Sequence, residues 1–406
     1  MWTFYHIGIV MYVSAIKMAA LFSDKARRWV EGRKDLFTRM AEKLPGDKPS
    51  IWMHCASLGE FEMGRPVLEA LRKDYPGHLL VLTFFSPSGY EIRKNYQGVD
   101  LVVYLPPDLP GHVRRFLSLT RPVLALFVKY EFWFGYLREL NRRQIPVMLI
   151  SGRFRPGQHF FRWYGGWFYR QLHAFSRLHL QDQESAMLAG QPLQAKVTVS
   201  GDTRYDRVSA NAATHRDLPE IKVWLNGRKC MIAGSTWPAD DQLMLPWNDP
   251  EMALIIAPHE VHPQRIRQLQ QMAGAAATLY SDLPKSNTGN ILIIDNIGML
   301  LSVYALGELA YVGGGFGSGL HNILEPAAFG LPVIFGPDHK KFPEAAALIK
   351  AGAAGSVSTR SDFEAAVKGF CDPGRMERAR ESARNFVLQR KGATMKIMQS
   401  VHELIS

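Results

Sequence analysis

The chain is poor in cysteine, with only Cys55, Cys230 and Cys371 among its 406 residues. These residues lie far apart and form no Cys-x-x-Cys pair, which argues against a disulfide framework and against a zinc ribbon. The sequence also lacks an Asp-x-Asp string and the signatures of the common RNA-binding modules. These absences favour a protein of a reducing compartment that uses neither structural zinc nor nucleic acid.

The chain has fewer acidic than basic residues: 37 aspartates and glutamates and 48 lysines and arginines, which give a formal net charge of +11. This excess suggests an anionic partner, such as a membrane surface or a phosphorylated substrate. The length, together with a hydrophobic content of 47%, predicts two domains that each bury a core of their own.

Polar residues are scarce in residues 1–22, where His6, Ser14 and Lys17 are among the few. The run is about membrane length. No basic segment precedes it and basic residues such as Arg27 follow it, so we expect an anchor on the cytoplasmic face of a membrane instead of a cleaved signal peptide. Lys17 leaves open whether these residues span the bilayer or lie on it, and a packed core helix is the alternative.

Beyond this segment, short apolar runs alternate with amphipathic stretches, a pattern typical of α/β domains with parallel sheets. Buried strands are predicted at residues 51–54, 79–84, 101–104, 123–127 and 147–150, and again at 231–233, 254–257, 291–294, 309–312 and 333–335. We therefore predict two Rossmann-like domains, residues 23–205 and 229–385, with a linker at 206–228 and a C-terminal helix at 386–406. Ligands are expected between the domains, at the carboxyl ends of the strands.

The most distinctive stretch is the glycine-rich run Gly-Gly-Gly-Phe-Gly-Ser-Gly-Leu-His-Asn-Ile-Leu-Glu-Pro-Ala at residues 313–327. Five glycines within seven residues let the backbone approach a ligand and offer unpaired N–H groups to an anion. Glu325, in the helix that is expected to follow, could reach the hydroxyls of a ribose. The alternative is a tight strand-to-helix turn without a ligand. A second turn suited to phosphate, residues 234–236, follows another predicted strand.

Two glutamates follow predicted strands of the first domain. Glu60 lies near a helix start, where the helix dipole favours the carboxylate form that can accept a proton. Glu131 is flanked by aromatic residues and could orient substrate hydroxyls or a nearby base. A first-turn preference for acids at Glu60, and pairing of Glu131 with Lys129, are the structural alternatives. Arg153 follows the next strand and offers two N–H groups to a carboxylate or phosphate.

Two further features allow more than one interpretation. His259 and His262 follow the strand at 254–257, but no third ligand has suitable spacing, so we favour hydrogen bonding over metal binding. The aromatic and basic run at residues 160–170 predicts either a membrane-docking surface or a packed helix.

Taken in order, six motifs resemble those of the bacterial 3-deoxy-D-manno-octulosonic acid (Kdo) transferases of lipid A and lipopolysaccharide biosynthesis. They are Ser-Leu-Gly-Glu at 57–60, Tyr-Leu-Pro-Pro-Asp at 104–108, Glu-Phe-Trp at 131–133, Gly-Asp-Thr-Arg-Tyr-Asp at 201–206, Gly-Ser-Thr at 234–236 and Gly-Leu-His-Asn-Ile-Leu-Glu-Pro at 319–326. The resemblance covers almost the whole chain, and the His-Asn-x-Leu-Glu-Pro-Ala motif is its most specific part.

The resemblance implies a GT-B fold, with CMP-Kdo bound by the C-terminal domain and a tetraacylated lipid A precursor bound by the N-terminal domain. It implies an enzyme of the bacterial inner membrane that inverts the anomeric centre, needs no cofactor and holds the donor phosphate without a metal. Glu60 matches the family's catalytic base, Glu131 matches its second required acid, and Glu325 matches the residue expected at the cytidine ribose.

The other expected site residues fall into two groups. On the donor side they are Gly234, Ser235, Thr236, Pro258, His259, Ile297, Gly298, Met299, Gly317 and Asn322, and on the acceptor side Ser57 and Gly59, with Arg153 or Arg204 as partner of the Kdo carboxylate. The family often has Pro-Arg-His-Pro-Glu-Arg where this chain has residues 258–265, which leaves open the side chain that replaces the phosphate-binding arginine. A non-catalytic nucleotide-binding membrane protein, or another nucleotide-sugar enzyme such as an epimerase, is the alternative function.

Overall fold

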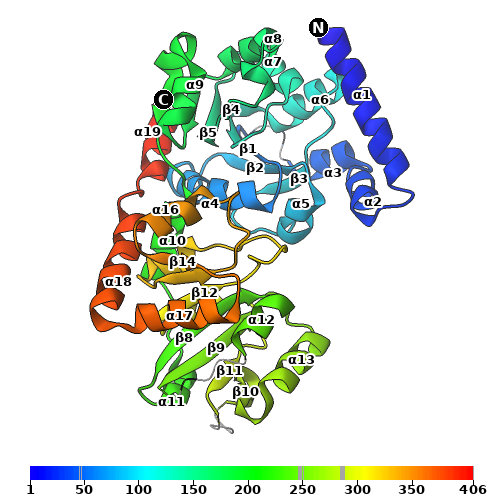
Figure 1. Cartoon of the computed structure of the whole chain (residues 1–406). Helices are drawn as coiled ribbons and strands as arrows, with labels where there is room; N and C mark the ends of the chain where they lie inside the picture. The colour runs from blue at the N-terminus through cyan, green and yellow to red at the C-terminus, as the bar shows by residue number, and fades with distance from the viewer. Residues whose placement is uncertain (45, 47, 246–248, 250, 284–288, 406) are drawn as a thin grey trace. The chain divides into compact units, whose positions relative to one another are not determined.

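Two parallel β-sheets organise the chain, one in each of two compact units (Figure 1). The computed structural model describes residues 1–44, 46, 48–245, 249, 251–283 and 289–405. Unit 1 comprises Met1–Asp206 and Gly392–Ser406, and unit 2 comprises Arg207–Lys391. Each unit is considered by itself below.

The sheet of unit 1 has seven strands in the order β3-β2-β1-β4-β5-β6-β7. They are β1 (Ser50–Cys55), β2 (Leu79–Phe84), β3 (Leu101–Tyr104), β4 (Pro122–Val128), β5 (Val147–Gly152), β6 (Arg177–Leu180) and β7 (Val197–Val199). Its helices are α1 (Trp2–Ala19), α2 (Asp24–Glu31), α3 (Leu36–Lys43), α4 (Leu58–Asp74), α5 (Pro87–Arg93), α6 (Pro110–Thr120), α7 (Phe134–Arg142), α8 (Gly166–Gln171), α9 (Gln183–Ala189) and α19 (Ala393–Ile405). The first five strands confirm the sequence prediction, whereas β6 and β7 were not foreseen.

Helices cover both faces of this sheet, which explains why its strands are mostly apolar instead of alternating with polar residues. Along β1, Trp52 packs into the cluster that includes Phe116 of α6, while its neighbour Met53 packs on the opposite face with Phe61 of α4. Ile397 of α19 joins the second cluster, so the last helix of the chain completes the core of the first domain.

Unit 2 repeats the same plan, with a seven-stranded parallel sheet in the order β10-β11-β9-β8-β12-β13-β14. The strands are β8 (Lys229–Thr236), β9 (Met252–Pro258), β10 (Ala277–Leu279), β11 (Ile291–Ile293), β12 (Leu309–Val312), β13 (Val333–Phe335) and β14 (Ala354–Ser356). The helices are α11 (Pro219–Leu225), α12 (Pro238–Met244), α13 (Pro263–Ala273), α14 (Leu300–Tyr304), α15 (Leu324–Ala328), α16 (Pro343–Lys350), α17 (Arg360–Cys371) and α18 (Pro373–Leu388). All five predicted strands of this half are confirmed, and the chain has two Rossmann-like domains.

In both sheets the first strand of the domain lies in the interior, and the strand order reverses beside it. β1 is hydrogen-bonded to β2 on one side and to β4 on the other, and β8 lies in the same way between β9 and β12. In open α/β sheets, ligands bind at the carboxyl ends of the strands at such reversal points. The topology therefore directs attention to the loops after β1 and β4 in unit 1, and after β8 and β12 in unit 2.

Helix α1 packs one face on unit 1 and exposes the other. Trp2, Tyr5 and Ile9 are half-buried, whereas Phe4 and Met11 on the outer side are exposed. Among the described residues, no single helix is long and apolar enough to cross a membrane. Helices α1 and α2 meet the criterion only when taken together, and they are bent by 119° at the break between them.

The aromatic run at residues 160–170 divides between core and surface. Phe160 is buried, and Trp167 packs half-buried against the same cluster, where its ring lies 5.3 Å from that of Trp2 in α1. Trp163, by contrast, is 95% exposed. Core packing thus accounts for only part of the run.

The segment at residues 206–228, expected to be a linker, takes part in two helices, α10 (Arg204–Ala213) and α11. Ile221 and Trp224 of α11 are buried in the core of unit 2, so their apolar side chains belong to a domain. At the other end, the expected C-terminal helix at 386–406 is divided between α18 and α19, and the break at Gly392 lets α19 pack on α4.

We predict that Asp206 stabilises the packing of the start of α19 on the rest of unit 1. Its Oδ1 accepts a hydrogen bond from the Gly392 N–H at 2.5 Å, and its Oδ2 accepts one from the Thr394 N–H at 2.7 Å. Asp206→Ala should lower the free energy of unfolding by about 1–3 kcal/mol, because two backbone donors lose a charged acceptor. Urea unfolding would measure this loss. The exposed Asp217, paired with Lys222, is the control, and Asp217→Ala should change the free energy of unfolding clearly less than Asp206→Ala. Equal effects of the two changes would contradict the prediction.

Candidate active site

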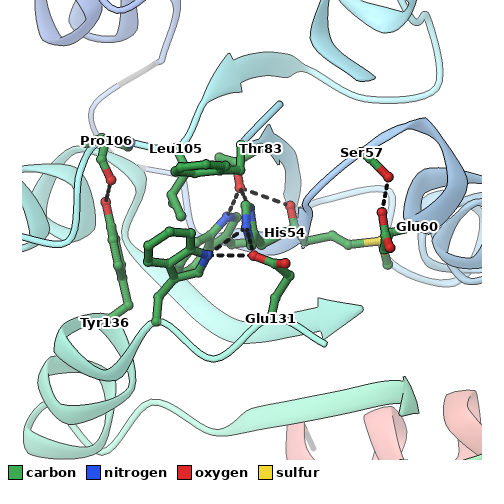
Figure 2. A network of polar contacts seen from close by, with 12 residues as sticks. His54, Ser57, Glu60, Thr83, Leu105, Pro106, Glu131 and Tyr136 are labelled. Carbon is green, nitrogen blue, oxygen red and sulfur yellow. Dashed lines mark hydrogen bonds and ion pairs between the residues drawn. The ribbon is translucent and has the colours of Figure 1, made fainter. Parts of the chain in front are cut away.

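Two acids flank the reversal point of unit 1. Glu60 lies in the first turn of α4, which follows β1, and Glu131 lies in the loop that follows β4. Because β1 and β4 are adjacent and parallel, both carboxylates lie at the same edge of the sheet (Figure 2). This is the geometry that the sequence predicted for the two residues.

Ser57 orients Glu60. It is the N-cap residue of α4, and its hydroxyl donates to Oε2 of Glu60 instead of accepting from a backbone N–H. Glu60 is half-buried, and the neighbouring Gly59 is exposed and adds no side chain beside the carboxylate. The helix start favours negative charge here. Glu60 is thus a partly accessible carboxylate held by one hydroxyl donor.

Glu131 is held by two nitrogen donors. Its Oε2 accepts from Nε1 of Trp133 at 2.7 Å and lies 3.1 Å from Nε2 of His54. His54 is buried in β1, and its Nδ1 lies 2.8 Å from Oγ1 of Thr83, which also accepts from Nε1 of Trp52 at 2.8 Å (Figure 2). A connected set of polar side chains therefore runs from the interior of the sheet to the Glu131 carboxylate.

The direction of these hydrogen bonds follows from what each group can do. An indole N–H only donates, so Thr83 accepts from Trp52 and can give its own proton to Nδ1 of His54. Nε2 of His54 then carries the hydrogen that Glu131 accepts. A lone pair at Nε2 could accept from the Trp133 N–H at 3.1 Å, but it would also face the Glu131 carboxylate and repel it, and that N–H already has Glu131 as acceptor at 2.7 Å. We infer that His54 donates to Glu131 and keeps this carboxylate in place.

The two arginines considered for the substrate carboxylate already have acidic partners. Nε of Arg153 lies 3.4 Å from Oδ2 of Asp182, and the Arg204 guanidinium binds Asp202 at 2.8 Å. Part of the charge of each arginine is therefore compensated within unit 1.

Helix α1 is joined to the loop that carries Glu131. The Tyr5 hydroxyl donates to Oδ2 of Asp108 at 2.5 Å, and the same oxygen accepts from the Gly135 N–H at 2.8 Å. Asp108 is only 1% exposed, and this burial raises the pKa of its carboxyl to about 6. Gly135 lies in the first turn of α7, four residues after Glu131, and a Cβ atom there would clash with the Asp108 carboxyl. Residues 1–22 are therefore partly integrated into the domain.

The reversal point of unit 2 brings together the turn after β8 and the glycine-rich loop after β12. Asp240 joins them, since its Oδ2 accepts from the N–H groups of Trp237 at 2.8 Å and Gly314 at 3.0 Å, while its Oδ1 accepts from the Tyr311 hydroxyl at 2.7 Å. The predicted turn Gly234-Ser235-Thr236 ends β8 itself. Asp240 thus fixes the relative position of the two loops.

Two glycines of this loop, Gly313 and Gly317, have different structural roles. A Cβ at Gly313 would lie 2.3 Å from the Ser235 carbonyl oxygen, so this glycine lets the two loops pack together. Gly317 has φ of +105° and open space around its Cβ position. Of the two, only Gly317 leaves room for a ligand, and the resemblance points to the same residue.

Three rings stack beside these loops. The Trp237 and His259 rings lie 4.8 Å apart, and the His259 and His321 rings lie 4.5 Å apart. Nε1 of Trp237 donates to Nε2 of His321 at 3.0 Å, while burial, helped by His259, lowers the pKa of His321 to about 4. His321 is therefore neutral near pH 7, with its hydrogen on Nδ1. His259 is exposed at the edge of the stack, so its role in unit 2 includes ring packing.

Glu325 lies in the first turn of α15, next to the glycine-rich loop. Its Oε1 accepts from Nδ2 of Asn322 at 3.1 Å, and Oδ1 of Asn322 accepts from the Leu324 N–H at 3.1 Å. In the connection after β11, Ile297 is 86% exposed and Gly298 is exposed, whereas Met299 is buried. Pro258, the last residue of β9, is also buried. Backbone groups of Ile297 and Gly298 are thus the accessible part of that connection.

Across the described residues, no group of three or more histidine, cysteine, aspartate or glutamate side chains is arranged to hold a metal ion. His262 instead accepts from the Arg265 N–H at 3.2 Å and caps α13.

Sequence reasoning missed His54, Thr83, Asp108 and Asp240. The available signal was a polar residue in an otherwise apolar strand, such as His54 in Ile-Trp-Met-His-Cys. A buried polar residue needs a partner, and here the partner is part of the site.

Comparison with known proteins gives one consistent result. Residues 31–207 match the family model described as 3-deoxy-D-manno-octulosonic-acid transferase (kdotransferase). A 3-deoxy-D-manno-octulosonic acid transferase of Haemophilus influenzae is 25% identical over 376 residues, covering 85% of this chain and 84% of the relative. The Bordetella pertussis protein of the same name is 26% identical over 402 residues, covering 90% of each.

Solved structures share the fold. The UDP-GlcNAc 2-epimerase from Neisseria meningitidis bound to UDP-GlcNAc has a TM-score of 0.59 and 14% identity, and the match covers 87% of this chain and all of that one. At this identity the likeness shows only the fold, two Rossmann-like domains of the GT-B class.

We predict that Tyr5 stabilises unit 1 through Asp108. Tyr5→Phe keeps the ring but removes a hydroxyl donor to a buried carboxyl, and should lower the free energy of unfolding by about 1–3 kcal/mol. Tyr164, which is half-exposed to solvent, provides the control, and Tyr164→Phe should change the value by less than about 0.5 kcal/mol. Denaturant titration of both variants measures the difference. An unchanged midpoint for Tyr5→Phe would show that the hydroxyl contributes nothing.

Proposed function

We propose that this chain, which is similar to the Kdo transferases along most of its length, is itself a transferase. In this proposal it moves Kdo from CMP-Kdo to a hydroxyl of a lipid A precursor. The observation that carries the proposal is the pair of carboxylates at the reversal point of unit 1, combined with a glycine-rich loop at the reversal point of unit 2. The first suits deprotonation of a hydroxyl and the second suits a nucleotide phosphate.

Glu60 is the general base in this proposal. It takes the proton of the acceptor hydroxyl as that oxygen forms a bond to the anomeric carbon of Kdo. The bond from that carbon to the phosphate oxygen breaks, and its electron pair leaves with CMP. Attack from the side opposite the phosphate inverts the anomeric centre. The hydroxyl of Ser57 keeps the Glu60 carboxylate oriented before the proton arrives.

Glu131 has a different task, because two N–H donors already engage its Oε2. Protonation of this oxygen would disrupt both contacts. We propose that Glu131 stays ionised, accepts a hydrogen bond from an acceptor hydroxyl and favours the positive charge that develops on the sugar in the transition state.

Unit 2 is proposed to bind CMP-Kdo. Backbone N–H groups of Gly234–Thr236 and Gly317, with Asn322, would surround the phosphate, and Glu325 would bind the ribose hydroxyls. The exposed connection at residues 297–298 offers backbone groups to the cytosine edge. The stacked His259 stands where the family often has arginine, and can donate to phosphate. No metal or cofactor is invoked.

A lipid acceptor at the cytoplasmic face of the inner membrane is consistent with the surface of unit 1. The outer face of α1 is apolar. A cavity of about 540 Å³ beside this helix is lined by Lys17, Lys34 and Arg115, which suit the phosphate groups of an anionic lipid. Arg153 or Arg204 is proposed to contact the Kdo carboxylate, at the expense of its present acidic partner.

Glu60→Gln tests the catalytic part of the proposal. Glutamine keeps the shape but cannot accept the proton, so turnover should fall by roughly 10²–10⁴-fold, while CMP affinity should hardly change. Steady-state transfer kinetics and calorimetry provide the two readouts. Glu69→Gln is the matched control, since Glu69 is an exposed partner of Arg65 on the same helix. If Glu60→Gln retains near-normal turnover, the base lies elsewhere.

Glu325→Ala tests the donor site. Loss of charge-assisted hydrogen bonds to ribose hydroxyls should weaken CMP binding by on the order of 1–3 kcal/mol, without a change in melting temperature. Glu364→Ala, at an exposed position paired with Arg360, should leave the affinity unchanged. Calorimetric titrations that give equal affinities for the two variants would place Glu325 outside the donor site.

A further inference from the structure

A cavity of about 300 Å³ lies in unit 1 between α1, α2 and the turn that follows β2. Most of its lining is apolar or aromatic, and the polar contribution is small. The lining residues are Tyr12, Ile16, Ala26, Trp29, Phe85 and Pro87, together with Ser23, Lys25 and Ser86. Such a lining suits a hydrocarbon better than a sugar, because a sugar requires several convergent polar groups.

Aromatic contacts connect this cavity with the candidate catalytic acid. The Tyr12 ring stacks on Phe85 at 6.1 Å, with an angle of 18° between the ring planes. Phe85 in turn lies 4.8 Å from the ring of Trp133, which donates its indole N–H to Glu131. A chain of side-chain contacts through Phe85 and Trp133 therefore links the cavity to Glu131.

On its other side the cavity adjoins exposed apolar surface. Met18, Leu21 and Phe22 follow Ile16 along the chain, and they are 71%, 72% and 90% exposed. Lys25, at the cavity itself, supplies a positive charge. An amphiphile with an anionic headgroup would therefore meet apolar contacts and a cation at the same place.

Trp29 adds a polar feature. The side chain lines the cavity and is only 5% exposed, yet within the described part of the chain its indole N–H has no acceptor. A buried donor without an acceptor is costly. Because the nitrogen is covered by protein atoms, the ester or amide carbonyl at the head of an acyl chain would relieve this cost only after a shift of the indole ring.

We propose that this cavity is a subsite for one fatty acyl chain of the acceptor lipid. The inference rests on the proposed function, because it assumes that the acceptor is acylated. The chain lies between α1 and Phe85, and the sugar hydroxyl to be glycosylated extends past Phe85 and Trp133 towards Glu131. Burial of methylene groups supplies the affinity. Helix α1 is then a wall of the acceptor site as well as a membrane-docking element.

The test fills the cavity and compares two acceptors. Ala26 lines the cavity on α2, and Ala26→Trp places a large ring there. For the tetraacylated lipid A precursor, we expect KM to rise tenfold or more, the effect of two or more methylenes that are no longer buried, with kcat nearly unchanged. For the fully deacylated precursor, kcat/KM should be the same as in the wild type.

Ala41→Trp is the matched control, because it makes the same change at an exposed position of α3 that does not line this cavity. It should alter neither acceptor's kinetics. Should Ala26→Trp fail to fold, Ile16→Ala removes part of the apolar wall and should raise KM several-fold for the acylated acceptor alone. Equal losses with both acceptors, or no loss with either, would overturn the subsite.

A binding measurement separates this inference from the proposed function. Equilibrium binding of the detergent-dispersed tetraacylated precursor requires no transfer. If the wild type binds it at least tenfold more tightly than Ala26→Trp but forms no product, the subsite stands and the transferase chemistry is wrong. If the two bind equally well, the subsite is wrong whatever the activity.

Discussion

The reversal of strand order beside β1 and beside β8 is the constraint on which both candidate sites depend. In an open parallel sheet the connections on the two sides of the reversal cross opposite faces, so the two neighbouring loops separate there and leave a place for a ligand. In unit 1 this space lies between the loops that carry Glu60 and Glu131. In unit 2 it lies between the end of β8 and the glycine-rich loop. One topological feature, used twice, accounts for the proposed acceptor site and the proposed donor site.

Buried polar side chains turn these loops into defined sites. His54 fixes Glu131 from within the sheet, and Asp240 joins the two loops of unit 2 through a single carboxylate. Asp108 does the same for α1 and the start of α7. Each of these groups bonds partners on different elements, which is where the site gains its rigidity. In the proposed mechanism Glu60, which accepts from the Ser57 hydroxyl, is the general base, and the more firmly held Glu131 is not.

The sequence predicted the features that are local. Apolar runs located ten strands, and the motifs at 57–60 and 313–327 located the loops at both reversal points. The strands β6, β7, β10 and β14 were missed because none of them is a continuous apolar run: they read Arg-Leu-His-Leu, Val-Thr-Val, Ala-Thr-Leu and Ala-Gly-Ser. The contact between Tyr5 and Asp108 joins residues 103 positions apart, and the pairing of Arg153 with Asp182 likewise depends on the fold. No periodicity reveals such partners.

The most direct measurement is transfer itself, with purified protein, radiolabelled CMP-Kdo and a tetraacylated lipid A precursor, and with products separated by chromatography. The account predicts that label moves into the lipid fraction as CMP is released in equal amount. Consumption of CMP-Kdo without labelled lipid, or no consumption at all, would contradict it.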